Sequence, residues 1–174
     1  TILRSLQFLG RVIDLFQTDT LDDAILQLLA KLLQYFFLLS CTQQDLQKLL
    51  RLLVHFLTLF DSKKTTQRVL EKTELRCVSI FQLLAGLVAK LPNTAVVTAV
   101  IQPSVLVHFL ALPTVPVPVL VEAMRLGAAL APAQTPARTS YAQQLAREKA
   151  LLLIRMQLPR CAASVDVVYA LVGL

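Results

Sequence analysis

The sequence predicts an all-α fold, built from antiparallel helical hairpins that stack side by side. Apolar residues recur every three or four positions over nearly the whole chain, which is the spacing of an amphipathic helix. Short polar or proline-containing segments interrupt this pattern where helices should begin and end. Of the 174 residues, 56% are hydrophobic and only 16% are charged. This composition excludes a disordered segment and leaves enough apolar side chain for a sizeable core.

Four helices are predicted before the first proline of the chain. The first has its apolar residues along one side and ends near Gln17. Residues 18–20 offer side-chain oxygens for the N-cap of the second helix. Thr42 caps the third, with Asp45 three residues later as in a capping box, and residues 61–62 mark its end. In residue numbers, the helices run from 2 to about 17, from the cap at 18–20 to about 39, from 42 to 61–62, and from 66 to 91.

Prolines divide the second half of the chain into shorter helices. Ala131–Thr139 is the clearest loop, because it combines proline with small polar residues. Ser140 then caps a further helix, which Pro159 should break. Val115–Val121 is the one segment that could instead form a strand. The candidate helices cover residues 94–101, 104–112, 117–130, 140 to about 157, and 164 onward.

No segment is expected to span a membrane, because a spanning helix needs roughly 20 consecutive apolar residues. Gln27, Lys31 and Gln34 interrupt one apolar run, and four prolines cut the longest uncharged stretch, residues 91–121. Thr1 opens on an amphipathic pattern rather than on a secretory signal. We therefore expect no membrane association. Because the sequence starts without Met and ends at Leu174 inside an apolar helical pattern, we also expect it to be a piece of a longer protein.

The cysteines indicate a reducing compartment. Cys41, Cys77 and Cys161 are widely spaced among apolar residues, which is typical of buried free thiols. A partner disulfide or a reactive thiol is the alternative. We expect an intracellular protein, cytoplasmic or nuclear, with one helical-repeat domain over residues 1–174. The loop 131–139 is its one candidate sub-boundary.

Internal similarity favours a stack of hairpins. Leu26–Leu39 matches Leu46–Leu59 at a constant offset of 20 residues, and Gln82–Leu87 echoes Gln27–Leu32 more weakly. Chance matching between leucine-rich helices is the alternative explanation. Hairpins of about 40 residues that repeat along a chain stack into a solenoid. On these segments the chain resembles the armadillo/HEAT class of α-helical repeats, over most of its length.

The resemblance implies a binding role. Armadillo proteins of the nuclear-import kind hold an extended peptide with rows of Asn and with Trp beside them. This chain has a single Asn, Asn93, and no Trp, so that mechanism is not expected. The resemblance then implies the looser HEAT-like use, in which an apolar or charged groove holds a partner helix or peptide segment.

Signatures of catalysis are missing from the sequence. The four glycines are isolated within helical patterns rather than gathered in a phosphate-binding loop. His55 and His108 lie far apart, with no Cys or carboxylate at the spacing of a metal site. The adjacent carboxylates Asp22 and Asp23 are explained by a helix start. We expect no enzyme, no cofactor and no metal.

Positive charge is concentrated in the middle of the chain, where residues 48–90 contain eight basic and three acidic side chains. Four of the basic residues recur every four positions along the helix predicted at 66–91, and a fifth lies beside its start. The basic ridge, as we call this set, comprises Lys63, Lys64, Arg68, Lys72 and Arg76. It could bind an acidic protein segment or nucleic acid. A solvated outer face, partly balanced by Glu71 and Glu74, is the alternative.

An apolar helix offers a second candidate surface. Residues 46–60 are apolar almost all round, so neighbouring helices or another chain must cover them. We therefore expect a non-catalytic protein-protein interaction scaffold that binds a partner helix or peptide segment in an apolar groove. Nucleic-acid binding through the basic ridge is the alternative function. Surplus apolar surface near the ends of the chain should be exposed or hidden by self-association.

Overall fold

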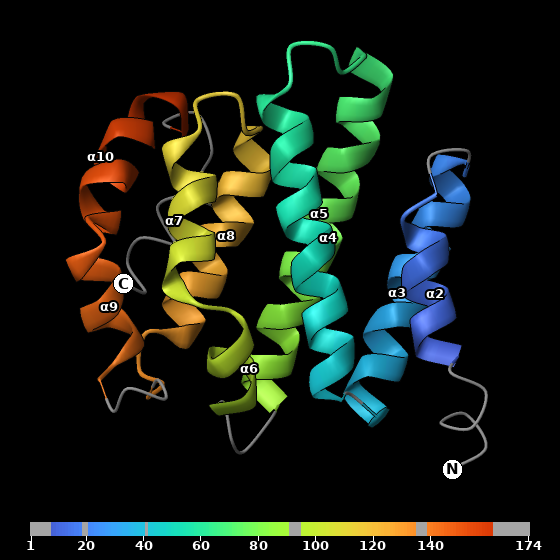
Figure 1. Cartoon of the computed structure of the whole chain (residues 1–174), viewed down its shortest axis with the longest axis horizontal. Coiled ribbons are helices and arrows are strands. Elements are labelled where there is room, and N and C mark those ends of the chain that lie inside the picture. The colour runs from blue at the N-terminus through green and yellow to red at the C-terminus, as the bar shows by residue number, and fades with distance from the viewer. Residues whose placement is uncertain (1–7, 19–20, 41, 91–94, 135–138, 162–174) are drawn as a thin grey trace.

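The computed structural model describes residues 8–18, 21–40, 42–90, 95–134 and 139–161, and over these residues the chain is all-helical, as predicted (Figure 1). Its regular elements, in chain order, are α2 (Phe8–Phe16), α3 (Asp23–Ser40), α4 (Gln43–Asp61), α5 (Gln67–Lys90), α6 (Ala95–Val100), α7 (Pro103–Ala111), α8 (Val117–Leu130), α9 (Tyr141–Arg147) and α10 (Ala150–Cys161). The alternative of a strand at Val115–Val121 is wrong, because Val117 already begins α8.

Two helix starts have the predicted caps. At α4, the backbone N–H of Asp45 donates to Thr42 Oγ1 at 3.2 Å, and the backbone N–H of Thr42 donates to Asp45 Oδ2 at 3.1 Å. Ser140 and Gln143 form the same reciprocal pair at α9. Each pair satisfies backbone donors that a helix start would otherwise leave without partners. The cap predicted at 18–20 falls partly outside the described residues.

The end of the described chain differs from the sequence prediction. The helix expected from Ser140 to about residue 157 is divided, because Lys149 has a φ of 60°, which is outside the helical region. The prediction that Pro159 breaks the helix is wrong, because Pro159 lies inside α10, two residues before its end. There it removes only one late backbone hydrogen bond. The helix expected from residue 164 lies outside the described residues.

The helices are arranged in two layers. In one layer, α2 contacts α4, α4 contacts α7, and α7 contacts both α9 and α10. In the other, α3 contacts α5 and α5 contacts α8. Four pairs of consecutive helices also contact each other across the layers: α2 with α3, α4 with α5, α7 with α8, and α8 with α9. Figure 1 shows α2 and α3 at one end of this row and α9 and α10 at the other.

Buried polar side chains attach the last helices to the row. Tyr141 Oη donates to the carbonyl of Ile101 at 3.0 Å, and Gln157 Nε2 donates to the carbonyl of Leu110 at 2.9 Å. Both side chains are buried, so leaving these donors without acceptors would be costly. The first bond therefore helps to fix α9 against the link between α6 and α7, and the second helps to fix α10 against α7.

Substituting Gly86 with alanine is expected to stabilise the protein by about 0.5–1 kcal/mol, because glycine inside a helix loses more backbone entropy than alanine. Gly86 lies inside α5, and a Cβ added there would meet no atom within 4 Å. Urea denaturation followed by circular dichroism measures the change. Gly10→Ala is the matched comparison: its Cβ would lie 2.9 Å from Lys48 Nζ, so the lysine must move and the gain should be smaller. A loss of stability on Gly86→Ala would contradict the open space beside α5.

Candidate interaction surface

The basic ridge does not lie entirely in solvent. Lys63 and Lys64, in the turn before α5, and Arg68, in its first turn, are exposed. Lys72 is half-buried, and Arg76 has no exposed surface. The expectation of one exposed row of five cations is therefore wrong for Arg76. The reason is geometric: each step of four residues rotates a helical position by about 40°, so the row curves from solvent toward the interior.

The two inner cations of the basic ridge hold the connection between α2 and α3. Arg76 Nη2 donates to the carbonyl of Thr18 at 2.7 Å, and Lys72 Nζ donates to the carbonyl of Leu21. Hydrogen bonds from charged donors are stronger than neutral ones, and a cation near the end of α2 also suits the helix dipole. These two side chains thus have a structural role within the chain, and Lys63, Lys64 and Arg68 are the ridge residues that face solvent.

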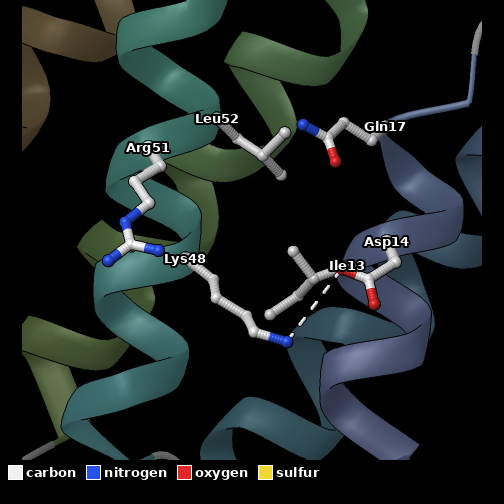
Figure 2. A pocket seen from close by; sticks show the side chains of 6 residues that line it. All are labelled: Ile13, Asp14, Gln17, Lys48, Arg51 and Leu52. Carbon is white, nitrogen blue, oxygen red and sulfur yellow. Dashed lines mark ion pairs between the residues drawn. The ribbon is translucent and has the colours of Figure 1, made fainter.

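A small cleft lies between α2 and α4 (Figure 2). Its lining residues are Ile13, Asp14, Gln17, Lys48, Arg51 and Leu52. Lys48 reaches toward Asp14, with 4.0 Å between Nζ and Oδ1, whereas Arg51 points away from α2. Such exposed pairs contribute little to stability. The cleft volume of about 190 Å³ is below the range of ordinary small-molecule sites.

The most extended apolar surface in the described residues lies on α3. Its outward side chains are Ile25 (46% exposed), Leu28 (61%), Leu32 (41%) and Tyr35 (63%). We call these four residues the α3 stripe. Their spacing of three, four and three residues places them along one side of the helix. Since Leu26, Leu33 and Phe37 on another side are buried, α3 is apolar both toward the core and toward solvent.

The two margins of the α3 stripe differ in chemistry. On the side toward the core, Leu29 and Phe36 are half-buried and continue the apolar surface. On the other side lies Lys31, which is exposed and makes no ion pair with any side chain in the described parts of the chain. Gln27 and Gln34 follow it further round the helix. The α3 stripe is thus an apolar surface with one cationic edge.

Exposed apolar side chains elsewhere are fewer or less regular. Leu151, Leu152 and Met156 are exposed on α10, but their spacing of one and four residues does not align them in a row. Leu15, Val54 and Val96 are each exposed singly on different helices. Isolated exposed residues of this kind are normal on a protein surface. The residues 46–60 expected as a candidate surface lie in α4, where most of the large side chains are buried.

The described residues bring together no group of three or more His, Cys, Asp or Glu side chains that could hold a metal ion. His55 and His108 are exposed on different helices. Cys77 and Cys161 are free and buried, and burial raises the pKa of each thiol above its ordinary value. A thiol with a raised pKa is a poor nucleophile at neutral pH. In the same parts of the chain, no helix combines the length and the apolar character that crossing a membrane requires.

Stability is expected to fall above about pH 9. Burial raises the pKa of Cys77 well above its ordinary value, and burial with the nearby Glu148 raises the pKa of Tyr141. The folded chain keeps both protons while the unfolded chain releases them, so the stabilisation is complete below the ordinary thiol and phenol pKa values. Above them it is lost by about 1.4 kcal/mol per pH unit for each group.

The measurement is the Tm between pH 7 and pH 11 for the natural chain and for Tyr141→Phe. The variant should have a lower Tm at pH 7, because it loses the hydrogen bond to the Ile101 carbonyl, and a shallower decline above pH 10. Tyr35→Phe is the control, since that side chain is 63% exposed, and it should follow the natural chain. An equal decline of Tm with pH in all three proteins would contradict the conclusion that the phenol of Tyr141 is buried in the folded chain.

Comparison with known proteins gives no function for these surfaces. No family model, no curated protein and no solved structure matches the chain. A functional conclusion therefore rests on the surfaces themselves, above all on the α3 stripe.

Sequence reasoning missed the α3 stripe. It noted Gln27, Lys31 and Gln34 as polar interruptions of an apolar run, and it named no exposed apolar side on this helix. A signal was present, because apolar side chains occupy far more of the helix circumference than one core-facing stripe of about 100° requires. The sequence could not identify which part of that apolar surface neighbouring helices cover.

Proposed function

We propose that the chain is a non-catalytic, intracellular scaffold module, cytoplasmic or nuclear, that binds a segment of a partner protein on the α3 stripe. The observation that carries the proposal is the row of four large apolar side chains exposed along α3. Their exposed fractions correspond to an apolar patch on the order of 400 Å², and patches of that size often mark interaction sites. The free, buried state of Cys77 and Cys161 supports a reducing compartment.

The layered arrangement supports an armadillo/HEAT-like stack within this proposal. The two helices of each of the pairs α2–α3, α4–α5 and α7–α8 lie in different layers, and each layer forms by contacts between helices of neighbouring pairs. In such a stack each hairpin contacts only its neighbours, so helices at the ends of the row keep an uncovered side. That α3 lies in the end hairpin of the described row is consistent with its uncovered apolar side.

The size of the α3 stripe suits a moderate affinity. Covering roughly 400 Å² of apolar surface would contribute about 10 kcal/mol at 25 cal/mol per Å². Association costs about 4–15 kcal/mol in lost freedom of motion and ordered side chains. The surface of the partner adds a further contribution of its own. A stripe of this area is at the low end of protein interfaces, where contacts are typically weak and transient.

A double substitution, Leu28→Ser with Leu32→Ser, tests the proposal. It should remove at least nine tenths of the partner protein captured from cell extract, because both central side chains of the α3 stripe lose their apolar surface. It should leave the far-UV circular dichroism unchanged, since both side chains are exposed in the folded chain. Quantitative mass spectrometry of the captured proteins measures the loss.

The matched control is Leu151→Ser with Leu152→Ser, which makes the same chemical change on α10. It should retain the partner. Loss of the partner in the α10 variant but not in the α3 variant would place the function elsewhere. Capture of nucleic acid with a steep dependence on salt would instead favour binding through the exposed Lys63, Lys64 and Arg68.

A further inference from the structure

The spacing of the α3 stripe matches the seam of a two-helix coiled coil. Ile25, Leu28, Leu32 and Tyr35 are separated by three, four and three residues, which are the a, d, a and d positions of successive heptads. Side chains at these positions interlock with a facing helix that crosses at about 20°. An extended peptide repeats every two residues and would not stay in register with them. The geometry therefore favours a helix as the occupant of the stripe.

The margins of the seam correspond to the heptad positions that control the choice of partner. Leu29 and Phe36 occupy the two e positions, and both are half-buried against the rest of the chain. Lys31 occupies the g position between them and is exposed. Charged residues at such flanking positions pair with opposite charges on the facing helix. A carboxylate beside Lys31 would complement this edge.

A second copy of this chain does not complement the seam. Suppose that two copies of α3 pair antiparallel with their stripes fully overlapped. The two-fold axis that relates the copies then lies at the midpoint of the stripe, which is residue 30. Identical flanks of the two helices then face each other. The two copies of Lys31 lie on the same side of the seam, about 3 Å apart along the helix direction. Like charges on facing flanks oppose pairing. In a parallel pair, Lys31 would face Phe36 of the other copy and would meet no carboxylate.

We infer that the partner segment on the α3 stripe is a single amphipathic helix with apolar a and d positions and carboxylates on the flank that faces Lys31. This inference rests on the proposed function and adds the chemistry of the partner to it. The apolar seam supplies the affinity, and Lys31 supplies the preference for an acidic flank.

Two synthetic peptides test the inference. Each is a lactam-stapled helix of two heptads with Leu at a and d, carrying either Glu or Lys at every flanking position. Fluorescence anisotropy measures the dissociation constant of each peptide at low salt. The natural chain should bind the Glu peptide at least threefold more tightly than the Lys peptide. Lys31→Glu should reverse this preference, and Leu28→Ser with Leu32→Ser should weaken both peptides at least tenfold.

The control for net charge is Arg155→Gln on α10. It removes one positive charge, as Lys31→Gln does, from an exposed position on the helix at the other end of the row. Lys31→Gln should reduce the preference for Glu by at least half, whereas Arg155→Gln should leave it unchanged. An equal effect of the two variants would overturn the role of Lys31.

The remaining outcomes separate the inference from the proposed function. One outcome is that the natural chain binds both peptides equally while the variant with Leu28→Ser and Leu32→Ser binds neither. That result would overturn the preference for an acidic flank but would leave the binding of a segment on the α3 stripe intact. If it binds neither peptide, the inference of a helical partner is overturned. Self-association that the α3 variant abolishes, measured by analytical ultracentrifugation, would identify a second copy as the occupant and would also overturn the inference.

Discussion

Substituting Phe109 with alanine is expected to lower the free energy of unfolding by about 3–5 kcal/mol, because it removes a large aromatic side chain from a closely packed interior. Phe109, in α7, has no exposed surface. Its ring meets that of Phe81, in α5, edge to face with 5.1 Å between the ring centroids. Such pairs contribute about 0.5–1.5 kcal/mol beyond the area that they bury. Urea denaturation followed by circular dichroism measures the loss.

The comparison for Phe109→Ala is Tyr35→Ala, which removes an aromatic side chain that is 63% exposed. It should change the stability by no more than about 0.5 kcal/mol, as is usual for exposed positions. If Phe109→Ala cost less than about 1 kcal/mol, α7 would not be packed against α5 through this aromatic pair.

Arg76→Ala is expected to destabilise the chain by about 3 kcal/mol. Arg76 is the largest fully buried side chain described, and it carries a hydrogen bond from α5 to the carbonyl of Thr18. The substitution removes a charge-assisted bond and the packing of the long side-chain stem, and it leaves a cavity. The connection from α2 to α3 should then be the first part of the chain to open. Hydrogen exchange should therefore accelerate in α2 more than in α8.

Arg68→Ala is the matched control, two helical turns earlier on the same helix. Arg68 is exposed, so its removal should change the stability by no more than about 0.5 kcal/mol. Equal and small effects at Arg68 and Arg76 would mean that both face solvent. The basic ridge would then be the continuous exposed row that the sequence predicts.

Local chemistry made two helix starts predictable. Thr42 with Asp45, and Ser140 as the cap of α9, act through hydrogen bonds within three residues, so the sequence contains the whole interaction. The prediction at Pro159 failed because only two residues of α10 follow the proline, so the helix loses a single backbone hydrogen bond there and no long segment depends on it. The break at Lys149 carried no comparable signal, since lysine rarely adopts a positive φ.

Tertiary packing was less predictable. The spacing of four residues in the basic ridge correctly indicated one side of a helix. The burial of Arg76, however, depends on α3 and on Thr18, which follows α2, lying beside α5. The sequence match at an offset of 20 residues aligns α3 with α4, which lie in different layers, whereas the weaker echo at Gln82–Leu87 aligns α3 with its neighbour α5. Similar leucine spacing thus did not reveal which helices share a layer. For the same reason, the sequence did not identify the uncovered side of α3.

A methyl NMR titration of the natural chain with the Glu-flanked peptide tests the role of the α3 stripe most directly. We expect the methyl signals of Ile25, Leu28 and Leu32 to shift as peptide is added. Those of Leu151 and Leu152, which are exposed on α10, should stay in place. Shifts on α10 with unchanged signals from all three α3 residues would contradict binding on the α3 stripe.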